Sequence, residues 1–179
     1  MQLLECFVPK SKWKIIREAT SDGRTLVKIN GIAGRFNEEN KNKRKYPEKV
    51  MKTALEAIQE KVKNRELTGA LDHPANTNIL LSQSSHLITK LWVDKNEVLW
   101  EAEILPTPSG EILKNLIDAN VTVGISSRGE GSLIPNEDGS SMVGEDFRLV
   151  TYDIVADPST RGAYATLSES VENKKKVDE

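Results

Sequence analysis

The sequence predicts an α+β protein in which a mainly antiparallel β-sheet or barrel carries two principal helices. Three observations lead to this fold class. Apolar residues recur at the three- and four-residue spacing of helices in two stretches. Several other short runs are rich in β-branched and apolar residues, which is typical of strands. Two of these runs follow each other with a short polar break, as in an antiparallel hairpin.

The first predicted strand covers residues 26–36 and bends at a glycine. Residues 39–49 are polar and basic and predict a loop. Pro47 occupies a position favoured at the start of a helix, because its missing N–H needs no partner there. An amphipathic helix that ends near Asn64 is predicted from the apolar residues Val50, Met51, Ala54, Leu55, Ile58 and Val62.

The second half of the chain also predicts both strands and a helix. Residues 84–105 hold two apolar runs around Asp94-Lys95-Asn96 and predict a hairpin. Residues 107–120 predict a second helix, with a Thr or Ser cap and one apolar face made of Ile112, Leu113, Leu116 and Ile117. Residues 121–126 and 145–156 predict further strands, and 136–141 predict a loop between them.

The domain organisation follows from length and from the composition of the C-terminal end. At 179 residues the chain is long enough for one domain with a sizeable core, which we assign to residues 1–168. Its first 25 or so residues are the least defined part. Residues 169–179 are charged and nearly free of apolar side chains, so we expect a disordered tail.

Composition excludes several classes of function. The net charge is −2, so no global basic field draws the chain to nucleic acid, and no apolar run is long enough to cross a membrane. Cys6 is the single cysteine, which rules out an internal disulfide and indicates a cytoplasmic protein. One cysteine and two well-separated histidines make no zinc site, and no phosphate-binding P-loop motif is present. We therefore expect no metal and no cofactor.

The two histidines are the candidates for a catalytic base. His73 precedes Pro74, which restricts it to extended geometry at a strand end or loop mouth. It is either such a base or a surface-loop histidine without a role. His86 lies in a predicted strand, and we expect it to be structural or to face solvent.

A serine pair between glycines offers a nucleophile. In Ser126-Ser127-Arg128-Gly129 the small residues indicate a tight turn or bulge. A functional interpretation adds that the N–H groups of Arg128 and Gly129 could approach a substrate carbonyl, as an oxyanion hole requires. Arg128 could equally form a surface ion pair.

An acid that orients the base must come from elsewhere in the chain. Asp153 interrupts an apolar strand, where a buried carboxylate needs a partner. Asp157 precedes Pro158 and fits a turn better. Asp72 is adjacent to His73, but the side chains of neighbours in an extended chain point in opposite directions, so the two seldom pair.

Four blocks of sequence, in this order, resemble the prohead core proteases of T-even-type tailed phages, serine proteases that clear the scaffold during capsid maturation. The blocks are "NKNKRKYP" ahead of a helix, "LTGALDHP", "VGISSRGEGSL" and "EDFRLVTYDIVADPST". They span about residues 30–165. The family is related to herpesvirus assemblins, so the resemblance implies an assemblin-like fold.

The resemblance also implies roles for individual residues. It makes His73 the general base, Ser126 the nucleophile and Asp153 the third member, with Ser127, Arg128 and Gly129 at the oxyanion and substrate site. It implies cleavage after Glu, and Arg128 is a candidate to receive that carboxylate. Departures from the family are Ala70, where Glu can occur, and Asp72, where Asn can occur. Residues before about 25 show no clear match.

The resemblance further implies where and on what the protein acts. Substrates would be scaffold, core and capsid proteins, processed inside the prohead in the host cytoplasm by a homo-oligomer such as a ring. One alternative is a noncatalytic phage assembly protein, because this fold is thought to be related to tail-tube proteins. A second is nucleic-acid binding through the basic residues Lys41–Lys45, for which a solvated loop is the simpler interpretation.

Self-cleavage follows from a family preference for Leu or Ile, any residue, then Glu and a small residue. Three bonds fit, after Glu18, Glu101 and Glu169. Glu101 lies in the predicted hairpin and should be protected. We expect cleavage after Glu18 or Glu169, since both lie near the ends of the chain, where mobility is greatest.

Overall fold

The computed structural model describes residues 1–7, 13–75 and 77–156. Its helices are α1 (Glu48–Lys63) and α2 (Pro108–Asp118), with a short 3-10 turn, η1 (Leu81–Gln83). The strands are β1 (Gln2–Phe7), β2 (Lys14–Ala19), β3 (Thr25–Arg35), β4 (Arg44–Lys45), β5 (Thr68–Ala70), β6 (Ser84–Asp94), β7 (Glu97–Ile104), β8 (Val123–Glu130), β9 (Leu133–Pro135), β10 (Ser141–Val143) and β11 (Arg148–Ala156).

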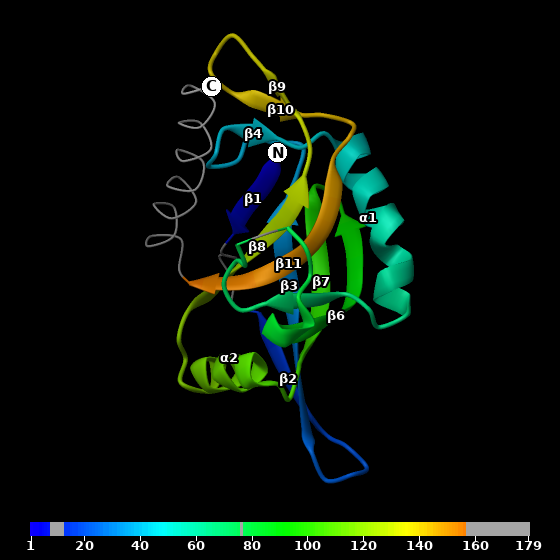
Figure 1. The fold of residues 1–179 in the computed structure, drawn as a ribbon, viewed down its shortest axis with the longest axis vertical. Coiled ribbons are helices and arrows are strands. Elements are labelled where there is room, and N and C mark those ends of the chain that lie inside the picture. The colour runs from blue at the N-terminus through cyan, green and yellow to red at the C-terminus, as the bar shows by residue number, and fades with distance from the viewer. Residues whose placement is uncertain (8–12, 76, 157–179) are drawn as a thin grey trace.

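The strands form three sheets whose pairings are antiparallel except for β4 with β10. One sheet has the order β1-β8-β11, a second has the order β2-β3-β7-β6-β5, and a small third sheet has the order β4-β10-β9. Figure 1 shows β8 and β11 running across the front of β3, with α1 along one side of the molecule. The predicted α+β class, mainly antiparallel with two principal helices, is confirmed.

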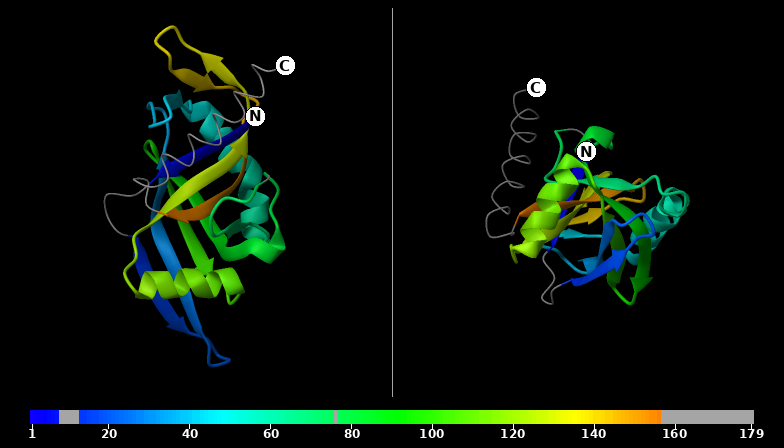
Figure 2. Two further views of the ribbon diagram at one scale, coloured as in Figure 1. Left: turned by 60° about the vertical axis from the view of Figure 1, so that its left-hand side comes forward. Right: turned by 90° about the horizontal axis from the view of Figure 1, so that it is seen from below.

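The two larger sheets join where β5 runs beside β11. Leu71, just after β5, forms a parallel bridge with Ile154, and the Thr151 hydroxyl donates to the Thr68 carbonyl across the same junction. β3 contacts β8 on the other side. Both sheets therefore face a common interior, as the views in Figure 2 show.

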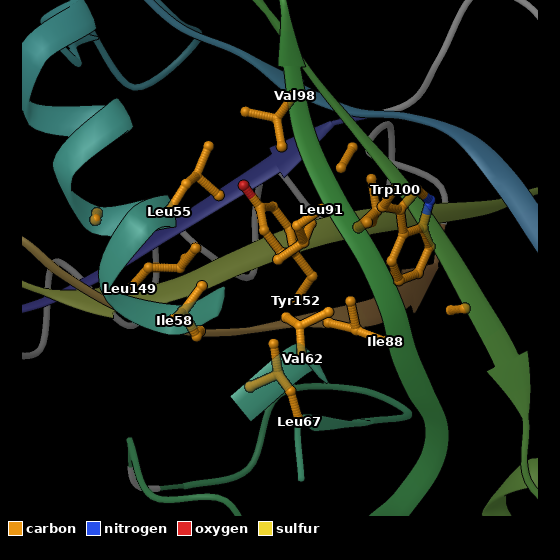
Figure 3. Packing of buried hydrophobic residues seen from close by; sticks show 14 of the residues in the cluster. Leu55, Ile58, Val62, Leu67, Ile88, Leu91, Val98, Trp100, Leu149 and Tyr152 are labelled. Atoms are coloured by element: carbon orange, nitrogen blue, oxygen red, sulfur yellow. The ribbon is translucent and has the colours of Figure 1, made fainter. Parts of the chain in front are cut away.

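The interior is filled by side chains from α1 and from both sheets. Figure 3 shows α1 placing Leu55, Ile58 and Val62 against residues of β6, β7 and β11, among them Trp100 and Tyr152. The helix forms because its apolar residues recur on one face, and all six predicted core residues of α1 are buried. It ends at Lys63, with Asn64 as its cap, as the spacing predicts.

The second helix begins where the sequence predicts, but its buried face contains fewer apolar residues than predicted. The Thr107 side chain caps it by accepting a hydrogen bond from the Gly110 N–H. Leu113 and Ile117 are buried against β6 and β7, whereas Ile112 is 53% exposed. The predicted four-residue apolar face is therefore wrong at Ile112, because adjacent positions on a helix are turned by about 100° from each other.

Several predicted strands and turns are confirmed. β6 and β7 pair as a hairpin around Lys95 and Asn96. β3 covers the strand predicted at 26–36, and its pairing with β7 shifts register between Ile32 and Gly34, where the bend was expected. The 136–140 segment connects β9 to β10. No helix within the described residues is both long and apolar enough to span a membrane.

One prediction for the polar segment before α1 needs correction. Residues 40–46 do not form a solvated loop throughout, because they alternate between inward and outward positions and include β4. Lys41, Lys43 and Lys45 are exposed, whereas Arg44 and Tyr46 are buried. The lysines thus occupy the outer positions of a strand-like segment.

Candidate active site

Ser126 and Asp153 are placed together by strand pairing. They are register partners in the antiparallel pair β8 and β11, so their side chains project from the same face of the sheet. β8 is the central strand of its sheet, with β1 on its other side. The nucleophile candidate therefore stands on a backbone that is fixed from both sides.

His73 reaches the same face from the loop after β5. The bridge from Leu71 to Ile154 aligns this segment with β11, and the Asp72 N–H donates to the Ile154 carbonyl at 2.8 Å. Asp72 has a φ of 65°, a left-handed conformation that Asp tolerates better than most residues. This turn redirects the chain, so that His73 points back over β11 and β8.

The three side chains form a continuous line of contacts. His73 Nε2 lies 2.8 Å from Ser126 Oγ, and His73 Nδ1 lies 2.8 Å from Asp153 Oδ2. The tautomer with its proton on Nδ1 satisfies both contacts, because Nδ1–H donates to the carboxylate and Nε2 accepts from the hydroxyl. A base within reach of a hydroxyl, oriented by a third group, is the arrangement that activates a serine.

Asp153 is held by further donors. Its Oδ1 accepts from the Ala70 N–H at 2.9 Å and from Arg128 Nη2 at 3.1 Å. Arg128 Nε lies 2.9 Å from Oδ2, the oxygen that faces His73. A fully buried carboxylate is stable only with such partners, so Ala70 and Arg128 explain how Asp153 can interrupt an apolar strand.

The line of contacts is largely shielded from solvent. Ser126 is 1% exposed, and the His73 side chain is 8% exposed. Hydrogen bonds are electrostatically stronger in such surroundings than in water.

The expected turn after Ser126 is absent. Residues 126–130 continue strand β8, and Gly129 is paired with Leu3 on one side and Leu149 on the other. In a strand with neighbours on both sides, backbone N–H groups point into those neighbours. The prediction that the N–H groups of Arg128 and Gly129 project from a turn toward a substrate is therefore wrong.

The side chains of the serine-arginine segment also separate from each other. Ser127 is the register partner of Tyr152 and faces the interior, away from the side of Ser126. Arg128 shares the face of Ser126, but it is buried and bound to Asp153, so it is neither a surface ion-pair residue nor open to a substrate carboxylate. Alternation along a strand explains both outcomes.

The other predicted candidates lie outside the line of contacts. His86 is fully buried, where Ser85 Oγ lies 2.8 Å from its Nδ1 and the Tyr152 carbonyl lies 2.8 Å from its Nε2. Burial lowers the pKa of His86. His86 is therefore structural, one of the two options predicted for it. Asp157 lies outside the described residues.

Sequence reasoning missed a second buried polar cluster, around Glu5 of β1. Glu5 Oε1 accepts from Arg44 Nη1 at 2.9 Å and from the Tyr46 hydroxyl at 2.8 Å. Its Oε2 accepts from the side-chain amides of Asn40 and Asn42, both at 2.8 Å. Burial raises the pKa of Glu5 despite the neighbouring guanidinium. The polar–lysine alternation in residues 40–46 was the signal that could have revealed it.

The candidate self-cleavage sites lie in different surroundings. Glu101 is in β7, between β3 and β6, as expected. Glu18 is in β2, paired with Leu26 of β3, and its carboxylate lies 3.6 Å from Lys28 Nζ. The expectation of a mobile segment at Glu18 is thus wrong, because the β2–β3 pairing includes it. Glu169 lies outside the described residues.

Comparison with known proteins agrees with the geometry of the site. The family model described as prohead core protein serine protease matches residues 6–175. The prohead core protein protease of Enterobacteria phage T4 is 33% identical over an alignment of 162 residues that covers 86% of this chain and 76% of that protein. A solved structure of the bacteriophage T4 capsid assembly protease matches with a TM-score of 0.80 and 28% identity, covering 88% of this chain and 98% of the other. The chain therefore belongs to the prohead core protein serine protease family.

Proposed function

We propose that this chain is a serine endopeptidase of prohead maturation, with Ser126 as nucleophile, His73 as general base and Asp153 as the orienting acid. The observation that carries the proposal is the unbroken line from Ser126 Oγ through both nitrogens of His73 to Asp153 Oδ2, with both contacts at 2.8 Å. Family membership gives the reaction class, and this geometry supports the assignment of roles.

The mechanism follows from the positions of the protons. Ser126 Oγ attacks the scissile carbonyl while His73 Nε2 takes the hydroxyl proton. The imidazolium then passes that proton to the leaving amine, and an acyl-serine remains. Water, activated by the same nitrogen, releases the new carboxyl end and restores the serine. Asp153 keeps the proton of His73 on Nδ1 and stabilises the imidazolium that forms.

The substrates that we propose are proteins of the prohead interior, namely scaffold and core proteins together with capsid proteins. The two relatives are named as a prohead core protein protease and a capsid assembly protease, which supports this class of substrate. We further propose cleavage after Glu, action as a homo-oligomer, and a location inside the prohead in the host cytoplasm.

A matched pair of serine variants tests the proposal. Purified chain is incubated with a fluorophosphonate probe and, separately, with a capsid scaffold protein whose new termini are mapped by mass spectrometry. We expect Ser126→Ala to abolish labelling and cleavage, and Ser127→Ala to retain both, because Ser127 faces the interior. The small probe is included because Ser126 is nearly covered. Activity lost only in Ser127→Ala would reverse the assignment, and a wild-type chain without labelling or cleavage would favour a noncatalytic assembly role.

Autoprocessing is a further part of the proposal. We propose cleavage after Glu169 first and after Glu18 second, because a protease binds an extended segment and β2 must leave β3 before its bond is accessible. Intact masses of wild type and Ser126→Ala, compared after long incubation, measure this order. Equal full-length masses, or a first cut after Glu101 in the middle of a sheet, would contradict it.

A further inference from the structure

Arg128 is the largest charged side chain that the structure buries beside the line of catalytic contacts. It is 1% exposed, on the same face of β8 as Ser126 and two residues further along the strand. A guanidinium cannot lose its charge in a protein, so burial at this depth requires a partner of opposite charge. Asp153 supplies that partner.

The contacts with Asp153 are side-on. Nη2 donates to Oδ1 at 3.1 Å, and Nε lies 2.9 Å from Oδ2. One nitrogen of the guanidinium is thus hydrogen-bonded to the carboxylate, and a second adds an ion-pair contact with its other oxygen, so Arg128 compensates the charge of Asp153 and holds it in place. Oδ2 is also the oxygen that meets His73 Nδ1. The orientation of this oxygen therefore depends on the guanidinium.

The third nitrogen of the guanidinium binds the loop that follows His73. Nη1 donates to the carbonyl of Asn78 at 2.8 Å and to that of Thr77 at 3.3 Å. The Thr77 hydroxyl makes a second contact with β8 by donating to Glu130 at 2.6 Å. One side chain thus links the strand of the nucleophile, the strand of the acid and the loop of the base.

We propose that Arg128 is a positioning residue of the catalytic site, which holds Asp153 in the orientation that His73 needs and fixes the loop that carries His73. This inference rests on the proposed function of Ser126, His73 and Asp153. It replaces the role at the substrate or oxyanion site that the sequence indicated for Arg128.

The charge of Arg128 has a separate consequence from its shape. In the resting site the guanidinium balances Asp153, so an imidazolium at His73 faces a carboxylate that is already compensated. Without the guanidinium, the negative charge of Asp153 beside His73 Nδ1 would be uncompensated. Among the described residues, the other titratable groups on the neighbouring elements are Asp72 in the loop of His73, Cys6 of β1 opposite Ser126, Glu130 on β8 and His86 on β6.

Two substitutions separate charge from shape. Arg128→Gln removes both, and we expect kcat to fall about 100-fold through misplacement, with KM little changed. We also expect the acid limb of the kcat/KM profile to move to higher pH, because the positive charge beside Asp153 is lost. Arg128→Lys keeps the charge but loses the planar guanidinium that donates to Asp153 and to the loop together, so kcat should fall while the acid limb stays in place. Arg35→Gln, which removes an arginine paired with Glu97 on distant strands, is the matched control and should change neither.

The outcomes distinguish this inference from the proposed function. A wild-type chain that neither cleaves scaffold protein nor is labelled at Ser126 would overturn the proposed function itself. A wild type that does both, with Arg128→Gln folded and showing an unchanged acid limb, would overturn the role of Arg128 alone. If Arg128→Gln fails to fold by circular dichroism, Arg128→Lys decides, because a wild-type kcat in that variant would show that the planar guanidinium is not needed.

Discussion

Asp153 illustrates at the residue scale how a buried charge can be both stable and useful. Four contacts reach its two oxygens, from His73, from the Ala70 N–H and twice from Arg128. These contacts satisfy the carboxylate and leave it one orientation. The histidine is thereby held in one tautomer, which a serine nucleophile requires.

A substitution that keeps the shape of Asp153 tests this dependence. Asp153→Asn places an amide where Oδ2 accepts from His73, so the imidazole loses the partner that fixes its tautomer. We expect kcat on a scaffold protein to fall by about 10⁴-fold, as in serine proteases that lose this acid. Circular dichroism and a thermal melt establish that the variant is folded. A wild-type rate from folded Asp153→Asn would remove this residue from the mechanism.

Gly69 belongs to the element scale, because it sets how closely β5 approaches β11. A Cβ at this position would overlap both His86 Nε2 and the Tyr152 carbonyl oxygen, which form a hydrogen bond with each other. We expect Gly69→Ala to lower the free energy of unfolding by about 1–3 kcal/mol. Cleavage activity should fall too, because β5 leads into the loop of His73. Gly34→Ala, where a Cβ has open space, is the control and should leave both unchanged.

A second prediction at the element scale concerns the strand β1, which Glu5 joins to residues 40–46. The Glu5 and Arg44 side chains are 14% and 4% exposed, so removing one charge leaves the other buried without compensation. We expect Glu5→Gln to lower the free energy of unfolding by about 3–5 kcal/mol. Glu5→Gln combined with Arg44→Met should cost less than the sum of the two single changes. Urea denaturation measures all three, with Lys45→Met as the exposed control.

Additive losses in that cycle would mean that Glu5 and Arg44 act independently. The same result would remove the reason we give for the burial of the alternate polar residues in 40–46.

The elements that sequence could predict are those with a strong local signal. α1, α2 and the β6–β7 hairpin follow from apolar spacing, a Thr cap and a short polar turn. The strand predicted from the sequence ends at Ser126, whereas β8 continues to Glu130. The small residues and glycines after Ser126 have the composition of a turn, but pairing with β1 and β11 keeps them extended. β1 carries no clear alternation and is fixed by Glu5 and by register with β8.

The site shows the same division between local and long-range information. His73 and Asp153 are 80 positions apart in the chain. The family resemblance predicts that they act together, whereas no local pattern in the sequence predicts their contact. The partners of Arg128 could not be read from its neighbours in sequence, because they depend on the register of β8 with β11 and on the path of a distant loop. Residue types were therefore predictable, and their contacts were not.

At the scale of the whole molecule, two buried groups give stability opposite dependences on pH. Burial lowers the pKa of His86, so below about pH 6.5 the unfolded chain binds more protons than the folded one, and stability falls as pH falls. Glu5 has a raised pKa, so above its ordinary value the folded chain binds more protons, and stability rises as pH falls through that window. A single pH curve of the wild type mixes both effects.

A variant that removes only the titration of His86 separates them. His86→Gln keeps a donor for the Tyr152 carbonyl but binds no proton, so the contribution of Glu5 is the same in both chains. We expect the difference in free energy of unfolding between wild type and His86→Gln to be constant above pH 7. Below about pH 6.5 it should shift steadily in favour of the variant, because only the wild type must keep a neutral imidazole in the buried site beside Ser85 and the Tyr152 carbonyl. Urea titrations from pH 5 to 8 on both chains measure this difference. A difference that stays constant across the whole range would contradict this prediction. It would mean that His86 takes up a proton as readily in the folded chain as in the unfolded one, although burial among β5, β6 and β11 disfavours the charged imidazole.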